Sequence, residues 1–149
     1  MLTAVLLLLS SEPGTMEDQR AKLRANIRTI VPQIEGRSKW SKADREDAMT
    51  MAEAAIVIWA DCVGTARARF ARSREPADTI ATASLGSCID DEGWARRAVL
   101  ISYGDLVSSS ERNARADKAI TGTRQKFRES VIAAVLKART NQGPKKGRR

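Results

Sequence analysis

The sequence predicts an all-α fold, in which an antiparallel helical hairpin over residues 41–72 and 76–105 is flanked by an N-terminal and a C-terminal amphipathic helix. Aromatic residues make up 4% of the chain, and β-branched residues do not alternate with polar ones as they do in strands. Only four prolines interrupt the helical pattern. Two cysteines, Cys62 and Cys88, stand at equal distances on either side of Glu75.

The hairpin follows from a symmetry about Glu75-Pro76. If the chain turns there, positions whose numbers add up to 150 face one another, and nearly all of them hold small residues. On the first helix these positions advance by alternating steps of four and three, which is the spacing of a seam between nearly antiparallel helices. The facing pairs are Cys62 with Cys88, Ala66 with Ser84, Ala55 with Ala95, Ala52 with Ala98, Ala48 with Ser102, and the bulky pair Trp59 with Asp91.

Small seam residues make a disulfide between Cys62 and Cys88 geometrically feasible. A disulfide needs Cα atoms about 4.4–6.8 Å apart, whereas helix axes usually pack at about 8–10 Å, so the backbones must approach closely. Closing a loop of this size stabilises a protein by about 3–4 kcal/mol in the chain-entropy model. The alternatives are two reduced, buried thiols, and a pair that cycles between the two redox states.

The composition argues against catalysis and metal binding. The chain has no histidine, the commonest general base and metal ligand, and no C-x-x-C motif. We therefore expect no enzyme activity, no catalytic residue, no metal and no cofactor. The acidic run Asp90-Asp91-Glu92 could in principle do acid–base chemistry or hold a cation, but Arg96 and Arg97 lie within helical reach. We expect ordinary ion pairs there.

The first fifteen residues have two interpretations. Leu2 to Leu9 form an apolar run followed by Pro13-Gly14, which suits a secretory signal peptide, although no Lys or Arg precedes the run. The alternative is a mis-annotated start, with translation beginning at Met16. The run is too short to cross a bilayer, so we expect no transmembrane segment. Residues 16–140 are expected to form one helical domain, and residues 141–149 a disordered basic tail.

Local signals place the first three helices. A helix from Met16 is predicted by an apolar stripe, and Pro32 should kink or end it. Ser41 and Asp44 resemble a capping box that opens a long helix running to about Arg72. Pro76 fits the first turn of the return helix. Gly86 and Gly93 each weaken a helix by about 1 kcal/mol, which makes a break near residues 90–93 an alternative to one continuous helix. The stripe consists of Leu23, Ile27, Ile30, Val31 and Ile34.

The end of the long helix carries four arginines, Arg67, Arg69, Arg72 and Arg74. They complement the negative pole of the helix dipole, so we interpret them as a solvated helix end, with anion binding as the alternative.

The C-terminal segment carries the whole basic excess of the chain. A boundary near Gly104-Asp105 and Ser108 precedes a last amphipathic helix, which is marked by Ile120, Phe127, Val131, Ala134 and Val135. Because Gly122 is a weak helix former, the sequence leaves the position of the first turn open. From Arg112 onward, twelve Lys or Arg face two acidic residues, a local charge of +10 against +8 for the whole chain.

Such a segment attracts nucleic acid or anionic lipid electrostatically, although it has no interleaved aromatics and no motif that sets a register. Binding to nucleic acid would therefore be non-specific. The candidate contacts are Arg124, Lys126, Arg128, Lys137, Arg139, Lys145, Lys146, Arg148 and Arg149.

At Trp59-x-x-Cys62, the Glu75-Pro76 turn, Ile80-Ala81, and Cys88 with Glu92 four residues later, the chain resembles a loose class of small, exported bacterial helical proteins. The resemblance covers roughly the middle third of the chain. It implies a helical hairpin with paired cysteines in a periplasmic setting, and it implies no particular activity.

Two functional hypotheses follow from the sequence. The first is a non-enzymatic, disulfide-stapled helical protein of the cell envelope, periplasmic or secreted, that acts through contacts with a protein partner or with further copies of itself. The second is a cytoplasmic basic helical protein with reduced thiols, whose C-terminal arm binds nucleic acid non-specifically.

Overall fold

Five helices make up the part of the chain that the computed structural model describes, which is residues 15–37, 40–104 and 107–141. These ranges contain no strand, and the predicted all-α fold is confirmed. The helices are α2 (Met16–Glu35), α3 (Lys42–Phe70), α4 (Ala77–Gly86), α5 (Ile89–Ser102) and α6 (Ser109–Asn141). The apolar run at residues 2–9, the tail at residues 142–149 and the predictions that concern them lie outside the described residues.

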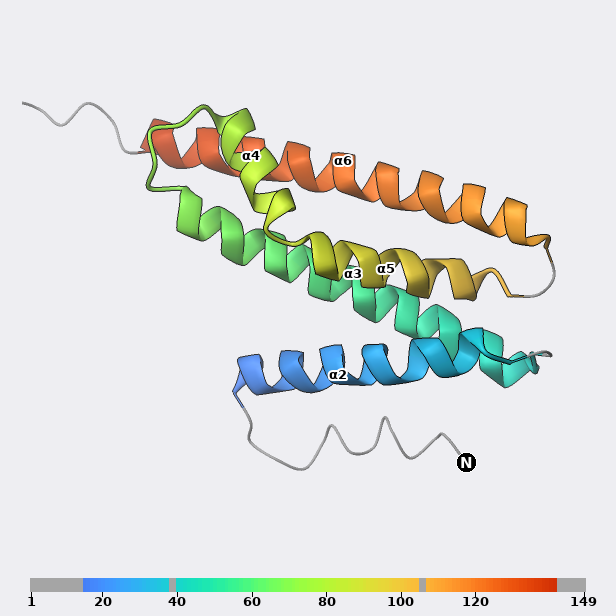
Figure 1. Cartoon of the computed structure of the whole chain (residues 1–149). Coiled ribbons are helices and arrows are strands. Elements are labelled where there is room, and N and C mark those ends of the chain that lie inside the picture. Colours follow the sequence, from blue (N-terminus) through green and yellow to red (C-terminus); the bar gives the residue numbers. More distant parts are fainter. Residues whose placement is uncertain (1–14, 38–39, 105–106, 142–149) are drawn as a thin grey trace, which may run out of the picture.

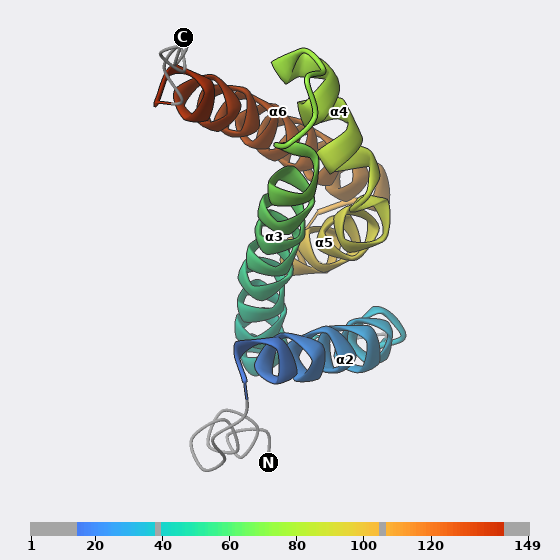
Figure 2. The ribbon, with the colours of Figure 1, turned by 90° about the vertical axis from the view of Figure 1, so that its left-hand side faces the viewer.

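The central layer is the antiparallel pair α3 and α5, which share the most extensive helix–helix contact (Figure 1). α2 packs against both of them on one side, and α6 packs against α4 and α5 on the other (Figures 1 and 2). α4 bridges the end of α3 and α6. The predicted hairpin is therefore the core of the molecule, and the two flanking helices cover its opposite faces.

Alanines line the contact between α3 and α5. Both predicted alanine pairs, 52 with 98 and 55 with 95, consist of buried residues. A small side chain lets the two backbones approach more closely than bulky residues allow. Trp59 is fully buried and meets Phe127 of α6 edge to face, with ring centroids 4.8 Å apart. Trp59 therefore joins the central pair to the outer layer.

The return helix is interrupted earlier along the chain than residues 90–93, the position considered from the sequence. α4 ends at Gly86 and α5 begins at Ile89, so the interruption lies at Ser87-Cys88 and not near residues 90–93. Gly93 lies on the exposed side of α5, and its cost of about 1 kcal/mol in a helix is offset by the buried residues around it. Those residues include Ala95, Ala98, Val99 and Ile101.

Three other predicted boundaries are corrected. Pro32 does not end α2, which continues to Glu35, because a proline so near the C-terminus removes a single backbone hydrogen bond while Ile34 beyond it is buried. Pro76 is the N-cap of α4 and precedes its first turn. α6 begins at Ser109, well before the predicted apolar stripe, and Ala116 in this early part is fully buried.

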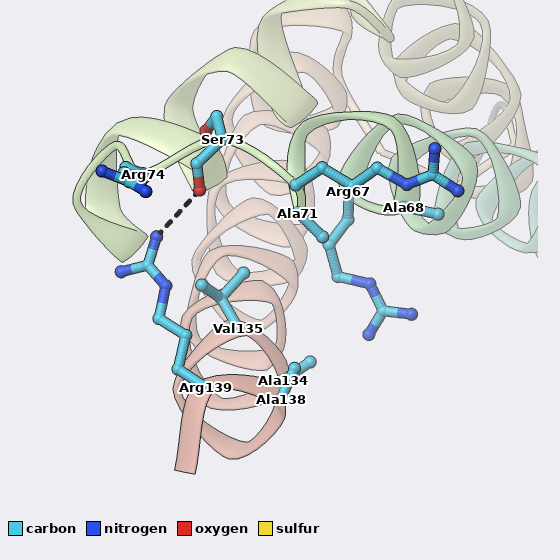
Figure 3. A pocket seen from close by; sticks show the side chains of 10 residues that line it. Arg67, Ala68, Ala71, Ser73, Arg74, Ala134, Val135, Ala138 and Arg139 are labelled. Atoms are coloured by element: carbon cyan, nitrogen blue, oxygen red, sulfur yellow. Dashed lines mark hydrogen bonds between the residues drawn. The ribbon is translucent and has the colours of Figure 1, made fainter. Parts of the chain in front are cut away.

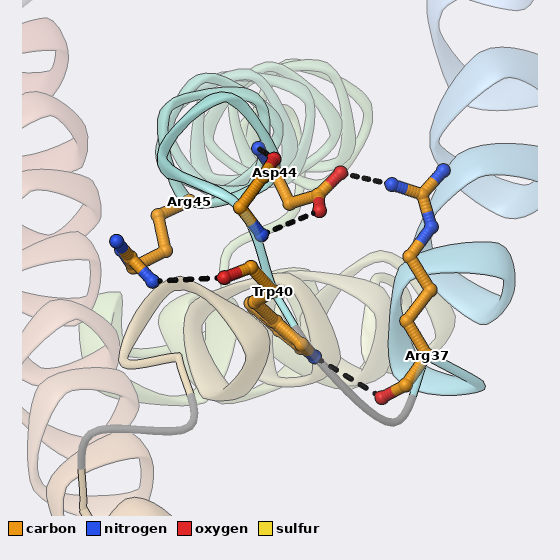
Figure 4. A network of polar contacts seen from close by, with 5 residues as sticks. Arg37, Trp40, Asp44 and Arg45 are labelled. Carbon is orange, nitrogen blue, oxygen red and sulfur yellow. Dashed lines mark hydrogen bonds and ion pairs between the residues drawn. The ribbon is translucent and has the colours of Figure 1, made fainter.

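The start of α3 confirms the predicted capping box. The Asp44 carboxylate accepts a hydrogen bond from the Ser41 backbone N–H (2.8 Å), and the Asp44 N–H donates to Ser41 Oγ (3.1 Å). Hydrogen bonding to the carboxylate, first from the Ser41 backbone and then from the Ser41 side chain, holds the pKa of Asp44 below its ordinary value of 3.8. Arg37 forms an ion pair with Asp44, and Arg45 donates to the Trp40 carbonyl at 3.2 Å (Figure 4).

Replacing Asp44 by alanine should lower the free energy of unfolding, because Asp44 satisfies an N-terminal backbone N–H of α3. A carboxylate whose pKa is lower in the folded than in the unfolded state stabilises the folded state at pH values above its unfolded-state pKa. This stabilisation is lost as the pH falls through the folded-state pKa. Denaturant titrations of wild type and Asp44→Ala should therefore differ at pH 7 and converge below pH 3.8. Glu53→Ala, an exposed carboxylate in mid-helix, is the control and should show little difference. A gap for Asp44→Ala that does not change with pH would contradict the assignment.

Candidate functional site

The two cysteines meet at the break between α4 and α5. Their Sγ atoms lie at disulfide-bonding distance, 2.10 Å, and their Cα atoms are 5.9 Å apart. Cys88 is the N-cap of α5 and is buried, whereas Cys62 on α3 is half-buried. The site predicted from sequence symmetry is thus one that the fold brings together.

The acidic run at the start of α5 is divided between two ion pairs. Asp91 accepts two hydrogen bonds from the Arg24 guanidinium of α2, at 3.1 and 2.9 Å, and these raise the pKa of Arg24. Glu92 pairs with Arg124 of α6 at 2.6 Å. Asp90 is exposed. The two carboxylates therefore tie α5 to the helices on either side of it.

The partners predicted for this run were wrong. Arg96 pairs with Asp117 of α6, and Arg97 pairs with Glu35 of α2, which raises the pKa of Arg97. Arg97 also lies over the Trp94 ring, 4.5 Å from its centroid. Helical spacing suggested that Arg96 and Arg97 pair with acidic residues of α5 itself. Their partners on α6 and α2 are closer, because these helices pack against α5.

The position of the acidic run has a local cause. The N-cap of α5 is Cys88, which makes no side-chain capping hydrogen bond. The first turn of a helix exposes N–H groups and carries a partial positive charge, and acidic side chains there compensate for the missing cap. All three acidic residues lie in that first turn. The arrangement supports a structural role and leaves neither buried carboxylate free for chemistry.

Among the predicted basic contacts, three of those on α6 bind other parts of the chain. Arg124 pairs with Glu92, and Arg128 pairs with Asp78 of α4. Arg139 donates to the backbone carbonyls of Ser73 (3.4 Å) and Glu75 (2.5 Å). Lys126 and Lys137 are exposed. The remaining candidates, Lys145, Lys146, Arg148 and Arg149, lie outside the described residues.

A cavity of about 740 Å³ lies where α3 and α6 both end. It is lined by four arginines, three from the end of α3 and the turn after it, and Arg139 from α6. Figure 3 shows Arg74 and Arg139 on one side of this cavity and Arg67 on the other. Ala134 and Val135 of α6 form part of its apolar lining. We call this the arginine cavity; its arginines are Arg67, Arg72, Arg74 and Arg139.

A second feature is the outer face of α3, where two large apolar residues are exposed on either side of Glu53. Met49 is 55% exposed and Val57 is 63% exposed. Val57 also borders a groove of about 370 Å³ between α2 and α3, together with Met16 and Leu23. Among the described helices, α3 alone is long and apolar enough to cross a membrane, a test that the core helix of a soluble protein also passes. The absence of a transmembrane segment therefore stays a prediction.

No group of three or more His, Cys, Asp or Glu side chains that could hold a metal ion occurs within residues 15–37, 40–104 and 107–141. Comparisons with protein-family models, with curated proteins and with solved structures find no match for this chain. The resemblance inferred from the residues around Cys62 and Cys88 therefore stays a prediction, and function has to be argued from the chain's own surfaces.

Replacing Asp91 by alanine should lower the free energy of unfolding by about 1–3 kcal/mol, because the change leaves a charged, partly buried Arg24 without its two hydrogen bonds. Asp90→Ala is a matched control on the neighbouring, exposed residue and should cost less than about 1 kcal/mol, the usual size of a helix-dipole contribution. Chemical denaturation followed by circular dichroism measures both. Equal losses for the two variants would show that the Arg24–Asp91 pair contributes nothing of its own.

Proposed function

We propose that this chain is a non-enzymatic, disulfide-stapled helical protein of the cell envelope, periplasmic or secreted, that acts through protein contacts. The observation that carries this proposal is the Cys62–Cys88 pair, whose Sγ atoms lie at bonding distance across the central helices. Disulfides form and persist in oxidising compartments and are rare in the bacterial cytosol. The pair joins α3 to the one break in the return helix, where a covalent link restrains both α4 and α5.

The lack of an enzymatic role is supported by the same residues that hold the fold together. The chain has no histidine. Both buried or half-buried carboxylates of the acidic run are occupied by arginines from neighbouring helices. A general acid or base needs a free carboxyl group within reach of a substrate, and these two have no such freedom.

Intact-mass measurement of the native protein tests the compartment and the bridge together. We expect no alkylation of Cys62 and Cys88 before reduction, and two adducts after it, on a chain that has lost residues up to the region of Ser10 to Met16. Cys62→Ser/Cys88→Ser should be less stable by about 3–4 kcal/mol, because the unfolded chain regains its loop entropy. A native chain that starts at Met1 or Met16 with both thiols freely alkylated would support the cytoplasmic alternative instead.

The contact surface that we propose is the outer face of α3, and the partner is a second copy of this chain. Bulky Met49 and Val57 lie in its first part, and small Ala60, Gly64 and Ala68 lie further along. A Cβ placed on Gly64 would have no neighbour within 4 Å, so the helix surface is open there.

An antiparallel pairing of two α3 helices matches this surface with itself. The bulky residues of one copy would face the small residues of the other, in both directions at once, as a two-fold interface requires. Burial of exposed apolar area drives such an association at about 25 cal/mol per Å². The arrangement would also cover the apolar groove that Val57 borders beside α2.

Sedimentation equilibrium of the purified, oxidised protein tests this interface. We expect a dimer for wild type and a monomer for Val57→Glu, because an unpaired carboxylate would be buried in apolar surroundings. Gly64→Ala should weaken the dimer, since an added Cβ has room in the free chain but takes up space that the second copy needs. Leu136→Glu is the control, because it replaces an equally exposed apolar residue on α6, and it should remain a dimer. A monomeric wild type at high concentration would refute the interface.

A further inference from the structure

The arginine cavity contains positive charges that are not used in ion pairs between helices. Among the described residues, the guanidinium groups of Arg67, Arg72 and Arg74 make no hydrogen bond or ion pair, whereas those of Arg124 and Arg128 of α6 each pair with a carboxylate. No acidic residue lines the cavity. Arginines gathered in this way repel one another unless a negative charge lies between them.

The helix dipoles do not account for this charge. α3 and α6 both end at the cavity, and the C-terminus of each helix carries roughly half a negative charge. Two such ends offset about one of the four guanidinium charges. The cavity therefore retains a net positive charge that favours an anion with more than one negative charge.

Arg139 gives the cavity a defined shape. Its guanidinium donates to the backbone carbonyls of Ser73 (Figure 3) and Glu75, which fixes the turn after α3 against the last turns of α6. The turn carries Arg72 and Arg74, so their backbone positions are set before any ligand arrives. Arg139 is thus a positioning residue, and the other three arginines have their guanidinium groups available for contact.

We propose that the arginine cavity binds a small anion that carries two or more phosphate groups. A guanidinium group presents a planar pair of N–H donors that matches two phosphate oxygens, and several arginines together bind successive phosphates. A volume of about 740 Å³ accommodates such a molecule. Farther along α6, Arg124 and Arg128 are already paired with carboxylates and do not add to the cavity, so the site suits a compact ligand better than an extended nucleic acid.

Titration calorimetry of the full-length, oxidised protein with sodium tripolyphosphate tests the site. Arg72→Gln/Arg74→Gln should weaken binding by at least about tenfold, because each arginine supplies charge-assisted hydrogen bonds. Arg139→Gln should weaken it less and should also loosen the turn, which amide hydrogen exchange at residues 71–76 would detect. The control Lys118→Gln/Lys126→Gln removes the same net charge from the exposed surface of α6 and should change the affinity by less than about twofold.

Two outcomes would overturn the proposal. One is the absence of tripolyphosphate binding at low salt, or an equal loss in the control variant, which would indicate unspecific attraction by net charge. The other is binding of a single-stranded oligonucleotide that depends on Arg72 and Arg74 while tripolyphosphate neither binds nor competes, which would assign the cavity to a nucleic-acid backbone. Because Val57→Glu leaves the cavity intact, it should bind tripolyphosphate like wild type whatever the oligomeric state.

Discussion

The close approach of α3 and α5 is the constraint on which the rest of the structure depends. Ala52 and Ala55 of α3, and Ala95 and Ala98 of α5, are all buried, and the two helices share the most extensive helix–helix contact. Because none of these side chains extends beyond Cβ, the backbones come near enough for the Cys62 and Cys88 Cα atoms to lie 5.9 Å apart. Larger residues would fill the seam and separate the thiols. The alanines of the seam bury little area per residue, and bulkier core residues of the central pair pack against the covering helices, as the contact of Trp59 with Phe127 of α6 shows.

The break at Ser87-Cys88 divides one predicted helix into two helices that pack against different neighbours. α5 stays on the seam, while α4 bridges the end of α3 and α6. The break exposes a new helix N-terminus without a side-chain cap, and the acidic first turn of α5 compensates for it. Asp91 and Glu92 then pair with Arg24 and Arg124, so the charges that stabilise the helix end also hold α2 and α6 in place. A cluster that resembles a catalytic motif in the sequence is explained by the fold itself.

Much of this architecture was predictable, because its causes are local or symmetric. The capping box at Ser41 and the pairing of Cys62 with Cys88 depend on spacing along the chain, and both predictions were confirmed. Propensity indicated the site of the break only in part. Gly86, which weakens a helix as Gly93 does, directly precedes the break, whereas packing outweighs the cost of Gly93 within α5. The early start of α6 was missed for a related reason, since its first turns bury only small residues such as Ala116 and show no apolar stripe.

The arginine cavity depends on residues that the chain brings together only after folding. In the sequence, Arg67, Arg72 and Arg74 look like the solvated end of one helix, and Arg139 looks like part of a separate basic arm. Once α6 lies alongside α4, the two groups share one cavity, and Arg139 is held by the Ser73 and Glu75 carbonyls. Their surroundings therefore separate these arginines from two others of α6: Arg124 and Arg128 meet carboxylates of α5 and α4 and join helices, whereas the arginines at the end of α3 meet none. Net charge alone could not separate these two groups, because the separation is made by where α4 and α5 place Asp78 and Glu92.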